Sequence, residues 1–255
     1  MRHVVSADGT EIAVYELGDA SGPAVLLLHG FASSTQRNWI DAGWDRALAE
    51  AGFRGIGMDL RGHGDSGNPA GEDAYDVTRF FEDVDAVIRS LNLAPDSWLG
   101  CLGYSMGSRL AYRFAGANPD VFSALVLGGL PASDPFEGID REMAVDALAG
   151  RVEATGPTAF VVQLATIFPE ANPQVLLDVV FGVSRAPFRP GENPPAVPML
   201  LMSGDKDDRA DDTESIVAVA PDARFAPIPG RNHLNAITSR KFKGGAFEFF
   251  AEHLR

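Results

Sequence analysis

The sequence predicts an α/β protein whose β-sheet is mostly parallel and is covered by helices on both faces. Short continuous apolar runs, such as residues 24–28 and 124–127, alternate along the chain with stretches of helical periodicity, such as 78–91. Continuous apolar runs are typical of strands that are buried on both faces of a parallel sheet. Strands that alternate with helices favour crossover connections, and 255 residues can form one such domain.

The first part of the chain supplies a hairpin and then alternating strands and helices. The hairpin is expected over residues 3–18, because Asp8-Gly9 is a strong turn pair between two β-prone stretches. Gly52 predicts the end of a helix, since glycine commonly terminates helices. We therefore expect, in order, a strand over 24–28, a helix over 39–51, a strand over 53–59 and a helix over 78–91.

The pattern changes between residues 131 and 196. This stretch has short helical patterns at 143–148, 158–167 and 173–181, no obvious buried strand, and a proline-rich end. We interpret it as a small helical cap insertion over the sheet, within a single domain of residues 1–255. After it, we expect strands at 197–203 and 223–228, a helix that ends at 217–220, and a C-terminal helix over 242–254.

Residues 98–112 predict a strand, a sharp turn and a helix, with Ser105 at the turn. The turn reads Gly103-Tyr104-Ser105-Met106-Gly107. We expect Ser105 to have a positive φ, and the glycines on either side to relieve the crowding of that turn. The N–H groups that open the helix would stabilise negative charge beside Ser105. The alternative is a surface turn before an amphipathic helix, because a short glycine-serine pattern alone is a weak signal.

Polar residues follow several of the predicted strands, at the point where each strand ends. They are His29-Gly30-Phe31, Asp59, Ser105, Asp207 and His233. Because the carboxyl ends of parallel strands lie along one edge of a sheet, and ligand sites form there, we expect these residues to meet in one crevice.

Together these motifs resemble the serine hydrolases of the α/β-hydrolase fold, over nearly the whole chain apart from the insertion. The order of nucleophile, acid and histidine along the chain matches that family as Ser105, Asp207 and His233. The stretch 59–66 matches the family's Asp-x-Arg-Gly-x-Gly-x-Ser loop. The resemblance therefore implies the α/β-hydrolase fold and a catalytic triad made of these three residues.

The resemblance also implies an oxyanion hole. His29-Gly30-Phe31 matches the family's oxyanion motif, so the two N–H donors are expected to be the backbone amides of Phe31 and Met106. His29 is then a structural residue of this loop. His63 is expected either to brace its loop or to be exposed.

The residue types fit the chemistry of nucleophilic catalysis. A serine hydroxyl needs a base within hydrogen-bond reach, and a histidine, with a reference pKa of about 6.5, is mostly neutral near pH 7 and able to take a proton. An acid must orient that histidine, here His233. The usual spacing in the family points from Gly204 to Asp207, and Asp208 stays open as the alternative acid.

The neighbouring acidic residues Asp211, Asp212 and Glu214 are interpreted as a solvated loop. No histidine or cysteine accompanies them at ligand spacing, so we expect no metal and no cofactor. An all-oxygen metal site remains the open alternative for these residues.

Charge and composition exclude several classes of partner. The net charge of −14 disfavours binding to nucleic acid and to anionic lipid. No apolar run approaches the roughly 18 residues of a membrane span, and we expect no signal peptide, so the prediction is a cytoplasmic protein. The single cysteine, Cys101, rules out an intrachain disulfide and is expected to be a buried small hydrophobe. The oligomeric state is not predicted.

The resulting expectation is a serine hydrolase that forms an acyl-enzyme, most simply a carboxylesterase for small to medium apolar esters. A carbon–carbon bond hydrolase or a lactonase on the same triad remains an alternative, as does a non-enzymatic small-molecule receptor on the same scaffold. Epoxide hydrolases and haloalkane dehalogenases share the scaffold but carry an aspartate in place of the serine at the sharp turn between strand and helix. Ser105 argues against them.

Overall fold

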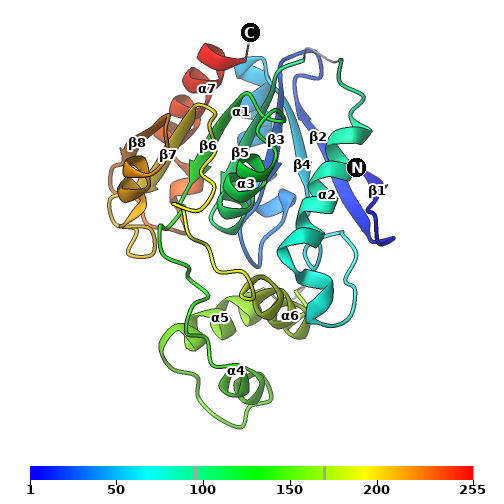
Figure 1. The fold of residues 1–255 in the computed structure, drawn as a ribbon, viewed down its shortest axis with the longest axis vertical. Coiled ribbons are helices and arrows are strands. Elements are labelled where there is room, and N and C mark those ends of the chain that lie inside the picture. Colours follow the sequence, from blue (N-terminus) through cyan, green and yellow to red (C-terminus); the bar gives the residue numbers. More distant parts are fainter. Residues whose placement is uncertain (95–96, 169–170, 255) are drawn as a thin grey trace.

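The computed structural model describes residues 1–94, 97–168 and 171–254. Its strands are β1 (Arg2–Val5), β2 (Glu11–Gly18), β3 (Ala24–Leu28), β4 (Arg54–Met58), β5 (Leu99–Tyr104), β6 (Ala124–Gly128), β7 (Met199–Gly204) and β8 (Ala223–Ile228). They form one sheet in the order β1-β2-β4-β3-β5-β6-β7-β8 (Figure 1). The hairpin strands β1 and β2 pair antiparallel, and the strands from β4 to β8 across the sheet pair in parallel. The predicted mostly parallel sheet is confirmed.

Helices cover both faces of this sheet, as predicted. The helices α2 (Val77–Ser90) and α3 (Met106–Ala117) lie on one face, and α1 (Trp44–Ala51) and α7 (Arg240–His253) lie on the other (Figure 1). Because successive side chains of a strand point to opposite faces, Leu26 and Leu28 of β3 join the first core while Val25 and Leu27 join the second. This double burial is the reason that the strands read as continuous apolar runs. Cys101 is fully buried in the first core.

Three helices lie between β6 and β7 in the sequence. They are α4 (Arg141–Leu148), α5 (Gly156–Ile167) and α6 (Pro173–Val183), and Figure 1 shows them together at one end of the sheet. They correspond to the three helical patterns predicted there, with ends that differ by up to two residues. The predicted cap insertion, residues 131–196, includes 169–170, which lie outside the described residues.

Two predicted helices differ from the structure. The helix expected over 39–51 is interrupted: a π-helical turn covers Gln36–Ile40, Gly43 adopts the left-handed conformation with φ 75°, and α1 begins at Trp44. The helix expected to end at 217–220 is instead a 3₁₀-helix, Thr213–Ala218. Only Thr213 and Ile216 of that segment are buried, so it has too narrow an apolar face to support a longer α-helix.

None of the helices in the described part of the chain combines the length and the apolar character that a membrane crossing requires.

Candidate active site

Ser105 lies at the tight turn between β5 and α3. Its φ of 52° and ψ of −114° are strained values for a non-glycine residue, as predicted. The flanking glycines allow this turn to pack. A Cβ atom on Gly103 would lie 2.6 Å from the Cα of Ser108, and one on Gly107 would lie 2.1 Å from the carbonyl oxygen of Leu28. The turn therefore requires glycine at both positions.

The structure brings Ser105, Asp207 and His233 together, although they follow three different strands. The Ser105 Oγ atom lies 2.9 Å from His233 Nε2, and His233 Nδ1 lies 2.9 Å from Asp207 Oδ2. An ionised carboxylate can only accept hydrogen bonds, so Nδ1 carries the proton and Nε2 is left to accept from the serine hydroxyl. This arrangement prepares Nε2 to act as a base toward Ser105.

Asp207 and Asp208 have different positions, although they are neighbours in the sequence. The Asp207 residue is 2% exposed, and its second carboxylate oxygen accepts the backbone N–H of Arg209 at 3.1 Å. Asp208 is exposed and lies at the cavity lining. The buried carboxylate, held at both oxygens, is therefore the one that contacts the histidine.

The predicted oxyanion loop lies beside the nucleophile. A Cβ atom on Gly30 would lie 3.4 Å from Ser105 Cβ, and the Gly30 N–H donates to Asn38 Oδ1 at 2.8 Å. Phe31 and Met106 both line the cavity around Ser105. Met106 is the first residue of α3, so its N–H has no acceptor within the helix. Both residues thus line the same cavity as Ser105.

Two buried histidines support the loop that contains Gly30 and Phe31. His29 is fully buried, and its Nε2 accepts the N–H of Leu60 at 2.9 Å. His63 is 4% exposed and its Nδ1 lies 3.0 Å from the carbonyl oxygen of Arg61, while its Nε2 is buried and has no partner among the described residues. Its ring packs against those of His29 and Phe31. Burial lowers the pKa of His63 to about 3, with a further contribution from His29.

The Asp59–Ser66 motif holds the loops behind the site. Asp59 accepts the backbone N–H groups of Thr35 at 2.6 Å and of Asp65 at 2.9 Å. The fully buried Arg61 forms two hydrogen bonds with Asp83, at 2.6 and 2.7 Å, and a third with Asp8. The motif therefore connects the loops around the site to one another and to α2.

Tyr104 is a residue of the site that the sequence reasoning did not single out. Its hydroxyl donates to the backbone carbonyl of His233, and burial raises its pKa. The contact fixes the loop that carries the histidine. Its position directly before Ser105 was the signal that could have singled it out. Its hydrogen-bond partner could not be predicted, because it lies 129 residues away in the sequence.

A cavity of about 840 Å³ opens above Ser105 and His233. Its roof is α5, which contributes Phe160, Leu164 and Ile167, followed by Phe168. Two arginines stack on aromatic rings of this roof. The Arg209 guanidinium lies 3.4 Å from the Phe160 ring centre, and that of Arg37 lies 3.8 Å from the Phe168 ring centre. Cation–π contacts thus join the roof to the segment that follows β7 and to the π-helical turn Gln36–Ile40.

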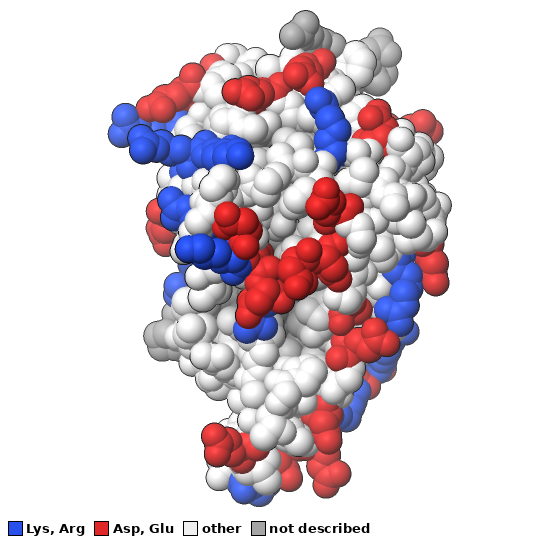
Figure 2. Space-filling model, turned by 90° about the vertical axis from the view of Figure 1, so that its left-hand side faces the viewer, with Lys and Arg blue, Asp and Glu red and all other residues white. Residues whose placement is uncertain are grey.

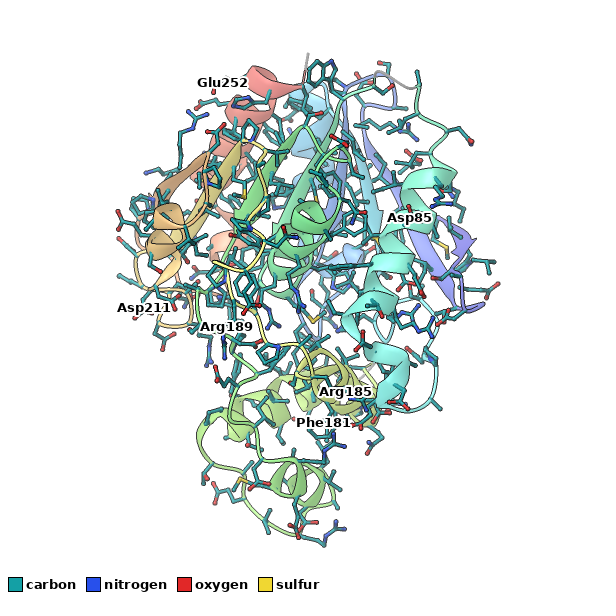
Figure 3. The ribbon with its side chains drawn as sticks, viewed as in Figure 1. Asp85, Phe181, Arg185, Arg189, Asp211 and Glu252 are labelled. Carbon is teal, nitrogen blue, oxygen red and sulfur yellow. The ribbon has the colours of Figure 1, made fainter. Side chains whose placement is uncertain are left out.

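The chain segments that lead to and from the helices α4–α6 are fixed to the core by buried polar contacts. Arg109 of α3 pairs with Asp134 at 2.7 Å, and the other oxygen of Asp134 accepts the N–H of Phe188. Farther along the chain, Arg185 pairs with Glu72 and Asp73 of the 3₁₀-helix Glu72–Tyr75 that precedes α2, and Figure 3 shows Arg185 at the end of α6. The outgoing and returning segments are therefore both tied to the sheet domain.

The acidic residues after Asp208 differ in part from the predicted solvated loop. Asp211 points outward into solvent (Figure 3). Asp212, however, accepts the backbone N–H groups of Ala132 at 2.8 Å and Ser133 at 2.9 Å, so it anchors the start of the insertion. Figure 2 shows many acidic side chains on one face of the molecule. Among the described residues, no three histidine, cysteine, aspartate or glutamate side chains gather in a geometry suited to a metal ion.

The fold and the serine at its elbow define an α/β protein with a hydrolase-type site. The family model described as the alpha/beta hydrolase fold matches residues 23–166, more than half of the chain. The protein belongs to this family, which confirms the resemblance seen in the motifs.

Individual proteins resemble parts or all of the chain. A protein named as a putative 2-succinyl-6-hydroxy-2,4-cyclohexadiene-1-carboxylate synthase from Bacillus subtilis is 37% identical over 125 residues, which cover 49% of this chain and 43% of that relative. The match thus spans less than half of the relative's length.

Two solved structures have the same fold over nearly their whole length. An esterase from Thermogutta terrifontis has a TM-score of 0.74 and 21% identity, covering 100% of this chain and 99% of that one. An enol-lactonase from Burkholderia xenovorans LB400 has a TM-score of 0.78 and 20% identity, covering 98% and 100%. At these identities the likeness establishes the fold.

Proposed function

We propose that the protein is a serine hydrolase that forms an acyl-enzyme on Ser105 and hydrolyses carboxylic esters. The observation that carries this proposal is the continuous relay of hydrogen bonds from Ser105 through His233 to Asp207. An alcohol, an imidazole and a buried carboxylate in this order are the groups that activate a serine nucleophile. The apolar cavity above them suits the acyl or alcohol part of an ester.

In the proposed reaction, Ser105 Oγ attacks the ester carbonyl carbon while His233 Nε2 takes the hydroxyl proton. The Asp207 carboxylate stabilises the imidazolium that forms, and the N–H groups of Phe31 and Met106 donate to the oxyanion. The tetrahedral intermediate collapses, the bond to the alcohol oxygen breaks, and His233 returns its proton to the leaving alcohol. A water molecule then attacks the acyl-enzyme in the same way, which releases the acid and restores the serine.

Turnover of p-nitrophenyl esters by the wild type and by Ser105→Ala tests this proposal. We expect a loss of at least about a thousandfold in Ser105→Ala, because removal of the nucleophile of a triad leaves only oxyanion and binding effects. Ser215→Ala is the matched control, since Ser215 is exposed and lies outside the cavity lining. A fluorophosphonate should add one covalent mass to the peptide that contains Ser105. Full activity of Ser105→Ala would end the proposal.

Cleavage of a lactone or of a carbon–carbon bond by the same triad is the second candidate. One observation favours a substrate with a carboxylate: Arg209, an exposed residue, lines the cavity. The Bacillus subtilis relative is named for a carboxylate product. A panel of lactones, a dienol-type diketone and graded esters separates these activities, and no turnover of any of them, with ligand binding retained, would favour the receptor alternative.

We also propose a small molecule as the binding partner and the cytoplasm as the location. The cavity supports the first, and the single buried cysteine fits a reducing compartment. Fractionation of the source cells, followed by detection of the chain, tests the location.

A further inference from the structure

The roof helix α5 is apolar on two faces, one covered by neighbouring helices and the other turned toward the cavity. None of its residues from Gly156 to Ile167 is charged. Thr158, Val161 and Ala165 are buried against the neighbouring helices α4 and α6. A helix that is apolar on nearly all sides is normally buried on all sides. The second face of α5 is only partly covered, by Arg209 over Phe160 and by the packing of Leu164 against a small buried cluster.

That second face lies along the cavity. Phe160, Leu164 and Ile167 follow one another at helical spacing, and all three line the cavity over Ser105. The arginine stacking at Phe160 and Phe168 holds the two ends of this face toward the core. The result is an apolar track along the underside of α5.

Two exposed apolar residues also border the cavity. Ile167 is 48% exposed and Leu234, the residue after His233, is 71% exposed, and both belong to the cavity lining. Apolar side chains that border a pocket suit an apolar ligand, because its binding removes their surface from water. Here they lie on two different elements, α5 and the histidine loop, that bound the same cavity.

We infer that the enzyme is built for esters of medium-length, unbranched acyl chains, with the chain lying along Phe160, Leu164 and Ile167 and leaving past Leu234. This inference rests on the proposed ester hydrolysis at Ser105. The eight residues from Phe160 to Ile167 span about 10 Å of helix. An extended chain advances about 1.2 Å per bond, so the track accommodates about eight carbons.

A series of p-nitrophenyl acetate, butyrate, hexanoate, octanoate and dodecanoate measures this preference. Each fully buried methylene favours binding by about threefold to fourfold, so kcat/KM should rise from acetate to octanoate by at least about thirtyfold and then level off. Ile167→Asp and Leu234→Asp should lower the octanoate-to-acetate ratio by about tenfold. Val219→Asp is the control, since Val219 is 44% exposed, apolar and outside the cavity lining, and should leave the ratio unchanged.

Leu164→Trp tests the track without adding charge, because a larger side chain there should shift the optimum to shorter chains. The inference is overturned if kcat/KM stays constant or falls as the acyl chain lengthens from acetate. If Ser105→Ala still abolishes activity in that case, the proposed function stands.

Binding separates the inference from the proposed function. Ser105→Ala should bind p-nitrophenyl octanoate more tightly than the acetate by at least about tenfold in calorimetric titration. Equal affinities overturn the inference even if the wild type hydrolyses no ester.

Discussion

Replacement of Asp207 by asparagine is the sharpest test of the proposed relay. The substitution keeps the shape of the side chain and removes its charge. The carboxylate is buried and lies 2.9 Å from His233 Nδ1 through Oδ2. An amide placed there can present its NH₂ group to Nδ1, which favours the wrong tautomer of the imidazole.

The size of the effect follows from the charge that is lost. An imidazolium and a carboxylate about 4 Å apart attract by about 4 kcal/mol at an effective dielectric constant of about 20. Each 1.4 kcal/mol is about a factor of ten in rate, so Asp207→Asn should lower kcat by about a thousandfold. Loss of the correct tautomer can extend this to about ten thousandfold.

The assay is the initial rate of hydrolysis of a soluble p-nitrophenyl ester between pH 6 and pH 9, with a circular dichroism spectrum as the check on folding. Asp208→Asn provides the matched control in the adjacent residue. Because Asp208 is exposed, its charge contributes at most about 1 kcal/mol, so this variant should lose less than about fivefold. Asp207→Asn within tenfold of the wild type, or an equal loss in Asp208→Asn, would refute the reasoning.

Three further predictions concern stability. Gly107→Ala should give little folded protein, because its Cβ would lie 2.1 Å from the carbonyl oxygen of Leu28; soluble yield and a wild-type melting temperature would contradict this. Asp134→Ala should lower the free energy of unfolding by about 3–5 kcal/mol in urea, since it leaves buried Arg109 without its partner, and a change below 1 kcal/mol would count against a fixed attachment of the cap. Burial lowers the pKa of His63 to about 3, below the ordinary value of about 6.5. Between these two pH values the unfolded chain therefore binds more protons than the folded one. The free energy of unfolding should fall as the pH falls through this window. This loss amounts to about 1.6 kcal/mol between pH 6.5 and pH 5, and His63→Asn should remove it. An unchanged slope of unfolding free energy against pH would exclude the histidine as its source.

Much of the fold was predictable because its signals are local. The run from Ala24 to Leu28 is apolar at every position because helices cover both faces of the sheet and all five side chains are buried. The turn at Ser105 needs glycines at fixed positions for steric reasons, so the sequence around it carries its own signature. Helix ends were less predictable, as the left-handed Gly43 before α1 shows.

The sequence alone therefore determined the class of fold, the serine at the turn and the set of residues that reach the shared sheet edge. The tertiary structure decided which carboxylate meets His233, that Tyr104 holds the histidine loop, that His63 is buried and that Asp212 anchors the insertion. These features depend on the direction of side chains in loops. That direction is set by hydrogen bonds between residues far apart in the chain, and no local periodicity encodes it.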